Sequence, residues 1–214
     1  MKIAKRVAKK VAKKVLSNRL AKKLYVRSGK AYIKQCMQWI DENSSALDIG
    51  CGNGYKSIEF MKHFNLNLVG LDIDNWLETS IPFQKFDGLN IPFPEKSFDI
   101  SMFLYVLHHA TDQEQLLLEA KKVTKKYVIV YEDVVNNRFD RIASALHGKM
   151  FNGIYDISNK CTFRSEKEWR AIFERCGFQV LSATKVSLKV NLIYPVNRVQ
   201  FVLGHAESAN SLAW

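Results

Sequence analysis

Three aspartates and a short run of glycines are the residues of this chain whose types and spacing could do chemistry. Residues 46–54 read ALDIGCGNG, so Asp48 stands just before Gly50, Gly52 and Gly54. Glycine has no side chain and tolerates positive φ, which lets a ligand lie against bare backbone. A helix predicted directly after this loop would offer unpaired N–H groups to a negative group.

The other two aspartates accompany later apolar runs. Asp72 ends the run LVGLD, and Asp87 lies within KFDGLNIPFP. A carboxylate is a two-oxygen acceptor, which suits the two hydroxyls of a ribose. A dinucleotide fingerprint requires G-x-G-x-x-G, whereas the third glycine comes one place early here and Tyr55 follows it. Asp72 alone would fit either kind of ligand, but Asp48 and Asp87 beside it argue against a dinucleotide.

The elements that position these residues alternate between strands and helices, with a short irregular stretch at 74–84. The predicted strands are 45–49, 68–72, 84–86, 98–105 and 127–132, and the predicted helices are 55–63 and 112–122. Near-continuous apolar strands that alternate with helices predict a parallel sheet covered on both faces. Ligands bind beyond the carboxyl ends of such strands, which is the position of Asp48, Gly50, Asp72 and Asp87.

Helix boundaries follow from local capping signals. Ser28-Gly29 interrupts the helical pattern, and the helix after it is predicted to end near Glu42-Asn43. Gly177 is predicted to end a later helix. Two pairs have the spacing of a capping box before an apolar helical pattern, Thr111 with Glu114 and Ser165 with Glu168.

At these motifs the chain resembles the class I S-adenosylmethionine (SAM)-dependent methyltransferases, specifically the small-molecule type with an LDIGCGNG first motif. The resemblance covers about 44–134 and returns at 163–180, where FRSEKEWRAIFERCGFQV is similar to that family's late helix and strand. It implies a Rossmann-like α/β fold, with a mostly parallel seven-stranded sheet, an antiparallel last strand and helices on both faces. The family places late strands near 178–187 and 198–204.

The resemblance also implies that SAM is the cofactor and that the glycine loop holds its methionine and ribose portions. Gly50 and Gly52 would line the floor, and Asp72 would accept hydrogen bonds from both ribose hydroxyls. Asp48 would orient the loop and meet the cofactor amine through water, since SAM has a cationic amine and sulfonium and no phosphate. Cys51 would fill space within the loop. Each aspartate taken alone could also be a turn-former or cap.

The adenine would lie one strand further along. Asp87 would accept from its amino group, the Gly88 N–H would bond a ring nitrogen, and Ile73 and Leu89 would sandwich the ring. Tyr105 would either contact the methionine portion or pack in the core. Together these assignments predict a cofactor site and no metal site.

Methyl transfer to a weakly acidic acceptor needs a base within hydrogen-bond reach, and candidates follow the fourth and fifth strands. His108 and His109 lie in LYVLHHA, where a histidine can instead serve packing or the start of a helix. Glu132 ends the fifth strand and is the candidate that would act as base or orient the acceptor. We predict these as the catalytic residues.

The positive charge of the chain is concentrated at its beginning. Residues 1–40 contain thirteen Lys or Arg and no Asp or Glu, whereas the other 174 residues carry nineteen basic and twenty-one acidic side chains. The segment 1–24 forms a basic amphipathic pattern. It could dock weakly on an anionic membrane surface, contact nucleic acid or another polyanion, or pack on the domain. The near-neutral remainder disfavours nucleic acid as the partner.

Composition and the lengths of the apolar runs indicate how the chain is organised. We divide the chain into a basic extension at 1–28 and a domain at 29–214, which includes an acceptor-side insertion at 134–164. The four cysteines are scattered, which argues against a zinc site or disulfides and fits a reducing cytoplasm. No apolar run approaches the length that spans a bilayer. We therefore expect a cytoplasmic monomer or weak dimer that could bind a membrane peripherally.

The resemblance leaves the methyl acceptor open. Aromatic and apolar residues of the 134–164 insertion favour a small, hydrophobic or lipid-like molecule, although the insertion could equally be a helix packed at the sheet edge. The alternatives are an RNA or protein methyltransferase that uses the basic helix, and a SAM-binding scaffold without catalysis.

Overall fold

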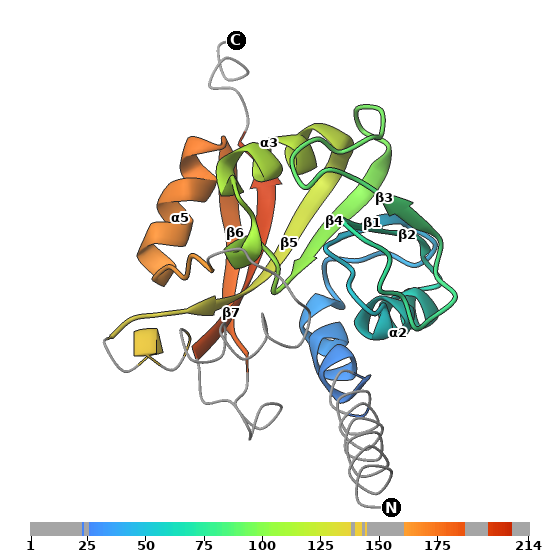
Figure 1. Ribbon diagram of the computed structural model, residues 1–214, viewed down its shortest axis with the longest axis horizontal. Coiled ribbons are helices and arrows are strands. Elements are labelled where there is room, and N and C mark those ends of the chain that lie inside the picture. Colours follow the sequence, from blue (N-terminus) through green and yellow to red (C-terminus); the bar gives the residue numbers. More distant parts are fainter. Residues whose placement is uncertain are drawn as a thin grey trace, which may run out of the picture.

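The computed structural model describes residues 23, 26–137, 140–142, 144, 161–186 and 197–206. Seven strands form a single sheet in the order β3-β2-β1-β4-β5-β7-β6 (Figure 1). Their bounds are β1 Ser45–Ile49, β2 Asn67–Asp72, β3 Phe83–Lys85, β4 Phe98–Leu104, β5 Thr124–Val134, β6 Phe178–Lys185 and β7 Asn197–His205. β7 pairs antiparallel with both β5 and β6, while the pairs among β1 to β5 are parallel. The predicted fold class is confirmed.

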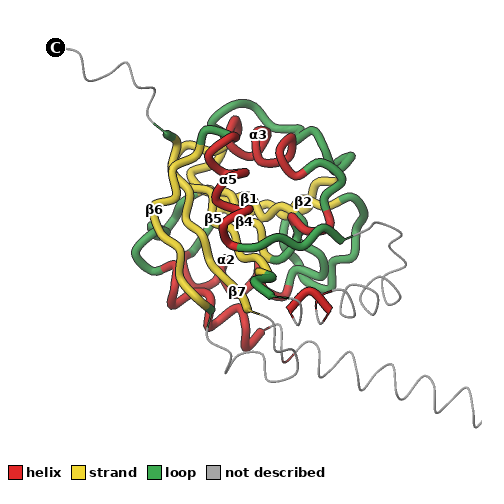
Figure 2. The backbone as a smooth tube through the Cα atoms, turned by 90° about the vertical axis from the view of Figure 1, so that its left-hand side faces the viewer, coloured by secondary structure: helices red, strands yellow, loops and turns green. Residues whose placement is uncertain are grey.

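Helices cover both faces of this sheet (Figures 1 and 2). Two of them, α3 (Gln113–Val123) and α5 (Glu166–Arg175), pack on one face, and α2 (Tyr55–Phe64) and a helix at 26–36 pack on the other. Side chains alternate along each strand, as pleating requires. Within β5, Val128 and Val130 join the cluster under α3 and α5, whereas Ile129 and Tyr131 join the cluster under α2. Burial on both faces explains why the strands read as continuous apolar runs.

Two predictions about the first helix are wrong. The helix at 26–36 runs through Ser28-Gly29, and it ends at Cys36 rather than near Glu42-Asn43. A Cβ on Gly29 would lie 3.3 Å from Cβ of Glu59 and 3.6 Å from Cα of Lys56. Gly29 therefore serves the close approach of this helix to α2, and the glycine does not break it.

One of the two predicted capping boxes is also wrong. The cap of α3 is Asp112, whose carboxylate accepts from the Gln115 N–H at 2.9 Å, one position later than the predicted Thr111. The carboxylate competes well for this position because it is a charged acceptor facing the positive helix end. At α5 the Ser165–Glu168 box is confirmed, and Gly177 follows the helix with φ of 71°.

Several predictions concern segments that fall largely outside the described residues. The extension at 1–28 is described only at Lys23 and 26–28, and the insertion at 134–164 lacks most of its length. The irregular stretch is described, and residues 73–82 contain no helix. Across the described part of the chain, no helix combines the length and the apolar character needed to cross a bilayer.

Candidate active site

Two glycines of the loop after β1, Gly50 and Gly52, have different surroundings. A Cβ on Gly50, which has φ of 75°, would lie 2.1 Å from Cγ2 of Val106, so this glycine lets the loop close against the end of β4. Gly52, with φ of 54°, has nothing within 4 Å of its hypothetical Cβ. The loop therefore packs tightly beneath Gly50 and presents bare backbone to open space at Gly52.

Cys51, between these glycines, turns toward the sheet. A Cβ on Gly70 of β2 would lie 2.8 Å from Cys51 Sγ, so the thiol occupies the space that Gly70 leaves. Burial raises the pKa of the thiol, and Asp48 and Asp72 nearby add to the effect. Cys51 thus matches the predicted space-filling role.

Asp72 ties the end of β2 to the glycine loop. Its Oδ2 accepts from the Gly52 N–H at 2.8 Å, and its Oδ1 accepts from the Ile73 N–H at 2.7 Å. Burial raises the pKa of this carboxyl although both backbone bonds oppose the rise, and the residue keeps 8% of its surface exposed. Each carboxylate oxygen has a further lone pair, so the group can still accept from a diol.

Asp48 lies beneath the loop, and 1% of its surface is exposed. Its Oδ2 accepts from the hydroxyl of Ser57, a fully buried residue of α2, while Oδ1 has no hydrogen-bond partner among the described residues. Burial raises the pKa of Asp48 to about 6. The arrangement fixes α2 to the end of β1 and leaves an unsatisfied acceptor under the loop.

The predicted adenine end is apolar and exposed. Ile73 and Leu89 are 41% and 36% exposed, which is unusual for large apolar side chains beside a loop, and a Cβ on Gly88 would lie 3.2 Å from Ile73. Asp87 turns into its own loop, where it accepts from the Leu89 and Asn90 N–H groups and from the Asn90 side chain. These bonds lower its pKa to about 2. Asp87 thus has the geometry of a turn-former, and its contact with adenine stays a prediction.

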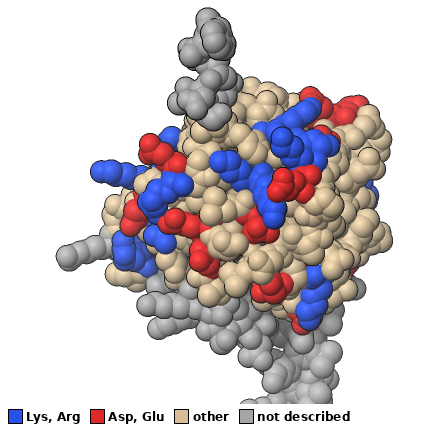
Figure 3. Space-filling model, turned by 90° about the horizontal axis from the view of Figure 1, so that it is seen from above, with Lys and Arg blue, Asp and Glu red and all other residues tan. Residues whose placement is uncertain are grey.

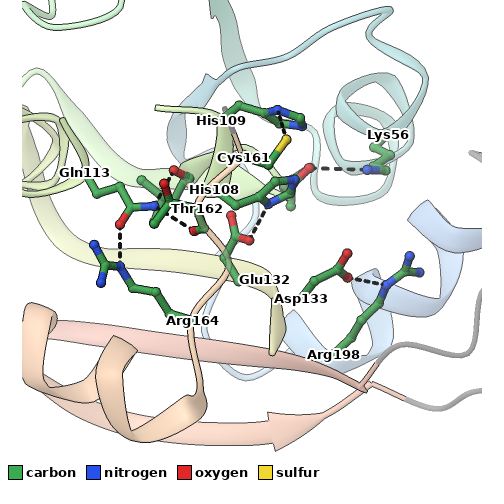
Figure 4. A network of polar contacts seen from close by, with 12 residues as sticks. Lys56, His108, His109, Gln113, Glu132, Asp133, Cys161, Thr162, Arg164 and Arg198 are labelled. Carbon is green, nitrogen blue, oxygen red and sulfur yellow. Dashed lines mark hydrogen bonds and ion pairs between the residues drawn. The ribbon is translucent and has the colours of Figure 1, made fainter. Parts of the chain in front are cut away.

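Two of the three predicted catalytic residues, His108 and Glu132, form a buried pair (Figure 4). His108 follows β4 in a short 3-10 helix, Leu107–His109, and its Nδ1 lies 2.7 Å from Oε2 of Glu132 on β5. The exposed fractions are 4% for His108 and 0% for Glu132. Burial alone would lower the pKa of His108, but the charge and hydrogen bond of Glu132, with Asp133 behind it, outweigh burial and raise it.

A segment at 161–164, which we call the strap, lies against the His108–Glu132 pair. The Thr162 N–H donates to the His108 carbonyl at 2.8 Å, and the Phe163 ring stacks on the His108 ring at 4.8 Å. His109, the other predicted histidine, has Nδ1 3.4 Å from Cys161 Sγ. Gln113 connects the 3-10 helix to the strap. Its amide nitrogen donates to the carbonyls of Leu107 and Thr162, and its amide oxygen accepts from Arg164. The strap therefore fixes the imidazole of His108 in place.

Tyr105, directly after β4, lies in a group of charges that the sequence prediction missed. Its φ is 68°, and Nζ of Lys56 and the guanidinium of Arg198 each lie 4.8 Å from its ring centre. Arg198 also donates to Asp133 at 2.7 Å, and Lys56 donates to the Leu104 carbonyl at 3.3 Å. Burial lowers the pKa of Lys56 to about 8.

A local signal could have found one of these residues. Lys56 is the second residue of α2, directly after the glycine loop, so its position at the site follows from the motif. Arg198 meets Asp133 across 65 residues of sequence, and nothing near either residue indicates the pairing. The described residues contain no cluster of three His, Cys, Asp or Glu side chains that could hold a metal ion.

A glycine loop, an acid at the end of each of the first two strands, and the buried pair of His108 after β4 and Glu132 near the end of β5 thus lie along one edge of the sheet. A family model described as "Methyltransferase domain" matches residues 20–183. The chain belongs to this methyltransferase family. Its domain is a class I, SAM-dependent methyltransferase domain, in agreement with the resemblance in its motifs.

Individual relatives of this methyltransferase differ in what they act on. A sterol 24-C-methyltransferase of Pneumocystis carinii is 26% identical over 165 residues, which cover 70% of this chain and 44% of that protein. A tRNA U34 carboxymethyltransferase of Nautilia profundicola is 31% identical over 91 residues, covering 37% and 30%. The chain thus spans less than half the length of these curated relatives.

Solved structures agree on the fold. A SAM-dependent methyltransferase of Methanosarcina mazei superposes with a TM-score of 0.62 at 18% identity, over 80% of this chain and 97% of that one. At such low identity the similarity concerns the architecture alone.

The loop of this methyltransferase fits SAM. Bare backbone at Gly52 faces open space, and Asp72 lies one hydrogen bond away from it. The unsatisfied Oδ1 of Asp48 is a buried acceptor for a donor that arrives with a ligand. These carboxylate acceptors suit the hydroxyls of a diol and a cationic amine, both of which donate hydrogen bonds.

Proposed function

We propose that this methyltransferase transfers a methyl group from SAM to a small, hydrophobic or lipid-like acceptor. The observation that carries the proposal is the aromatic surface at the carboxyl edge, where the Phe163 ring stacks on His108 of the buried His108–Glu132 pair and Tyr105 follows β4. Such a surface suits an apolar acceptor better than a charged polymer. The resemblance to a sterol 24-C-methyltransferase over 70% of the chain supports the same class of acceptor.

In this proposal the chain holds SAM by the contacts predicted from the motifs. Gly50 and Gly52 supply the floor, and Asp72 accepts from the ribose hydroxyls. Asp48 meets the amine, directly or through water. At the other end, the exposed side chains Ile73 and Leu89 cover the adenine, next to Gly88 and Asp87. When bound, SAM supplies an electrophilic methyl group on a sulfonium.

The residues of the chain then position the acceptor and take its proton. Glu132 holds Nδ1 of His108, so Nε2 is the nitrogen that would accept a proton from a weakly acidic acceptor. Glu132 is therefore a positioning residue, and the strap keeps the imidazole in one orientation. We assign His109 a supporting role, because it lies against Cys161. Proximity and exclusion of water supply the remaining rate.

A second candidate is methylation of RNA. The resemblance to tRNA U34 carboxymethyltransferases and the basic residues at the start of the chain favour it. Binding to RNA would weaken steeply with salt, whereas activity on an uncharged acceptor dispersed in detergent would change little. Activity measured across a salt series therefore separates the two candidates.

Calorimetric titration with SAM and S-adenosylhomocysteine tests the cofactor site. Asp72→Ala should abolish binding, because it removes the acceptor from the Gly52 loop. Asp74→Ala is the matched control, since Asp74 lies two residues away and bonds only exposed groups in the described contacts. A well-folded wild type that binds neither ligand would contradict the proposal. Binding followed by methylation of RNA, and of no hydrophobic molecule, would replace it by the second candidate.

A further inference from the structure

We propose that the exposed face of the helix at 26–36, together with the adjoining face of α2, docks on an anionic lipid surface. The evidence for this docking surface is its own charges and contacts, which do not depend on the proposed function. Its purpose, to bring a lipid-like acceptor to the carboxyl edge of the sheet, rests on the proposed function. We define the docking surface as Lys23, Arg27, Lys30, Lys34, Met37 and Lys62.

The first part of the docking surface is a stripe of basic side chains. Lys23, Arg27, Lys30 and Lys34 are all exposed and recur at spacings of three or four residues, so they share one side of a helix. The opposite side of the helix at 26–36 is buried, with Tyr32 at 1% exposed. The helix thus divides into a side packed on the sheet and a basic side toward solvent.

The second part is an apolar groove between this helix and α2. The groove has a volume of about 410 Å³, and Ile33 and Met37 line it together with Lys30, Lys34 and Lys62. Met37 is 62% exposed, although it is a large apolar residue. Glu59 is the one acid among the described residues that line the groove. An exposed apolar centre within a basic rim is the pattern of a surface that lies in a membrane interface.

The docking surface lies next to the active site. Tyr32, on the buried side of the same helix, has its ring 5.8 Å from that of Tyr105 and 4.6 Å from that of Tyr131. In Figure 1 the helix, in blue, lies below the end of β4, which is the edge where the parallel strands finish. The helix thus connects the docking surface on its outer side to Tyr105, directly after β4, on its buried side.

The distribution of charge elsewhere differs. Figure 3 views the molecule from above in Figure 1, where Lys and Arg are interspersed with Asp and Glu. Lysines of the described part at that end are paired, such as Lys125 with Asp99 and Lys126 with Asp41. The basic side chains of the docking surface thus differ from the mixed charges of Figure 3, in line with the absence of acids from residues 1–40.

The chemistry of the docking surface favours lipid over nucleic acid. Single-stranded nucleic acid is bound by basic grooves that also carry aromatic rings on which bases stack. The described lining of this groove carries one ring, the imidazole of His63, which packs edge-on against Phe64, and its apolar residues are Ile33 and Met37. Lysine ammonium groups bind anionic headgroups as point charges, and apolar side chains enter the acyl boundary.

Co-sedimentation of the full chain with vesicles tests the proposal. One vesicle type is phosphatidylcholine alone, and the other also contains phosphatidylserine. The triple variant Lys30→Gln, Lys34→Gln, Lys62→Gln should lower partitioning onto the anionic vesicles by on the order of 100-fold, since each lysine near such a surface contributes about fivefold. The matched control, Lys122→Gln, Lys125→Gln, Lys126→Gln, removes as many exposed lysines at the other end of the sheet and should bind like the wild type.

Further measurements separate the outcomes. Met37→Ser should weaken vesicle binding severalfold without a change in charge, and all variants should bind SAM like the wild type. Equal partitioning of the two triple variants would overturn the proposal, as would binding to RNA without binding to anionic vesicles. A wild-type protein that methylates a detergent-dispersed acceptor but does not bind anionic vesicles would refute the docking surface alone. Docking without methylation of any hydrophobic acceptor would refute the proposed function instead.

Discussion

The pair of His108 and Glu132 determines how this site should respond to pH. Glu132 is fully buried, and its Oε1 has no partner among the described residues, so its charge is tolerated chiefly through His108. The pKa of His108 in the fold is raised above the ordinary 6.5. The stabilisation from this pair is therefore fully present below about pH 6.5 and is lost as the pH rises through the raised value.

Replacement of Glu132 by glutamine should move the pH profile of methyl transfer. Without the carboxylate the pKa of His108 falls, because burial is then opposed only by the charge of Asp133, and the imidazole becomes a neutral base at lower pH. The rising limb of kcat against pH should shift toward acid while the maximal rate falls, since Glu132 no longer fixes the imidazole. Glu174→Gln, on the exposed side of α5, is the control. A profile that stays in place would contradict a role for the pair in proton transfer.

Asp48 offers a test in which stability and binding move in opposite directions. Its pKa in the fold is about 6 against an ordinary 3.8, so the folded protein holds this proton more tightly than the unfolded chain does. Stability from this group therefore declines as the pH rises from about 4 through about 6, by about 3 kcal/mol in all.

Asp48→Asn should remove that decline and keep the hydrogen bond from Ser57 through the amide oxygen. Urea unfolding should show a more stable variant near pH 8 and no difference near pH 4. Titration should show weaker SAM binding, since the carboxylate that we propose to meet the amine is gone. A variant less stable than the wild type near pH 8 would mean that the buried charge is compensated by groups outside the described contacts.

At the scale of elements, the loop between β1 and α2 combines packing and ligand contact in adjacent glycines. A methyl group on Gly50 would collide with Val106, and both glycines have positive φ. Gly50→Ala should therefore cost about 2–5 kcal/mol of stability, from the clash and the strained backbone. Gly52→Ala should cost only about 1 kcal/mol, because its Cβ meets open space.

For SAM binding the order should be reversed: Gly52→Ala, the less destabilised variant, should lose more affinity than its stability explains. Gly52→Ala places a methyl group where the ligand is proposed to lie, so it should weaken SAM binding at least tenfold in a protein that melts nearly like the wild type. The measurements are thermal unfolding and calorimetric titration of each variant. Wild-type affinity in Gly52→Ala would show that the ligand does not touch the loop there.

The sequence predicts elements well where the pattern is local. The strands beneath Asp48 and Asp72 were predicted within a residue or two, because burial on both faces makes them continuous apolar runs. The cap of α5 was predicted because Ser165 and Glu168 satisfy each other within one turn. The helix through Gly29 was not predicted. Gly29 is there because the helix approaches α2 closely, and no local pattern indicates that tertiary contact.

Side-chain contacts across the sheet were beyond prediction for the same reason. The pairing of Asp133 with Arg198 depends on the register of β5 against β7, whose connecting segments are long. The strap at 161–164 depends on how an intervening segment returns to β5, where Val134 bridges Arg164. Sequence spacing indicated which residues end strands, and tertiary structure determined which of them meet.

At the scale of the whole molecule, one buried polar cluster joins the first helix to the far side of the sheet. The Tyr131 hydroxyl of β5 donates to the Tyr32 carbonyl at 3.1 Å and accepts from the Gln200 amide of β7 at 2.8 Å. Burial raises the pKa of Cys36 to about 12, so its thiol is protonated and can donate to the same hydroxyl at 3.3 Å. Residues 99 positions apart are thereby connected directly behind Glu132.

Tyr131→Phe should detach the helix at 26–36 in part while it leaves the sheet intact. The substitution removes the Tyr131 bond to the Tyr32 carbonyl and leaves one N–H of the buried Gln200 amide without its partner, which costs about 1–3 kcal/mol. Amide hydrogen exchange should accelerate in the helix at 26–36 more than in β4 or β5. Tyr127→Phe is the matched control, because it lies on the same strand and face with its ring against Trp39.

The site should respond to this change at a distance. The ring of Tyr32 packs on Tyr105, so a loosened helix removes support from the residue that carries Lys56 and Arg198 over its ring. Acceptor affinity should fall in Tyr131→Phe while SAM affinity stays near that of the wild type, because the glycine loop and Asp72 make no contact with this cluster in the described residues. Equal losses of both affinities would mean that the helix supports the whole carboxyl edge rather than its acceptor half. If exchange accelerates uniformly, the cluster contributes to global stability and does not anchor this helix.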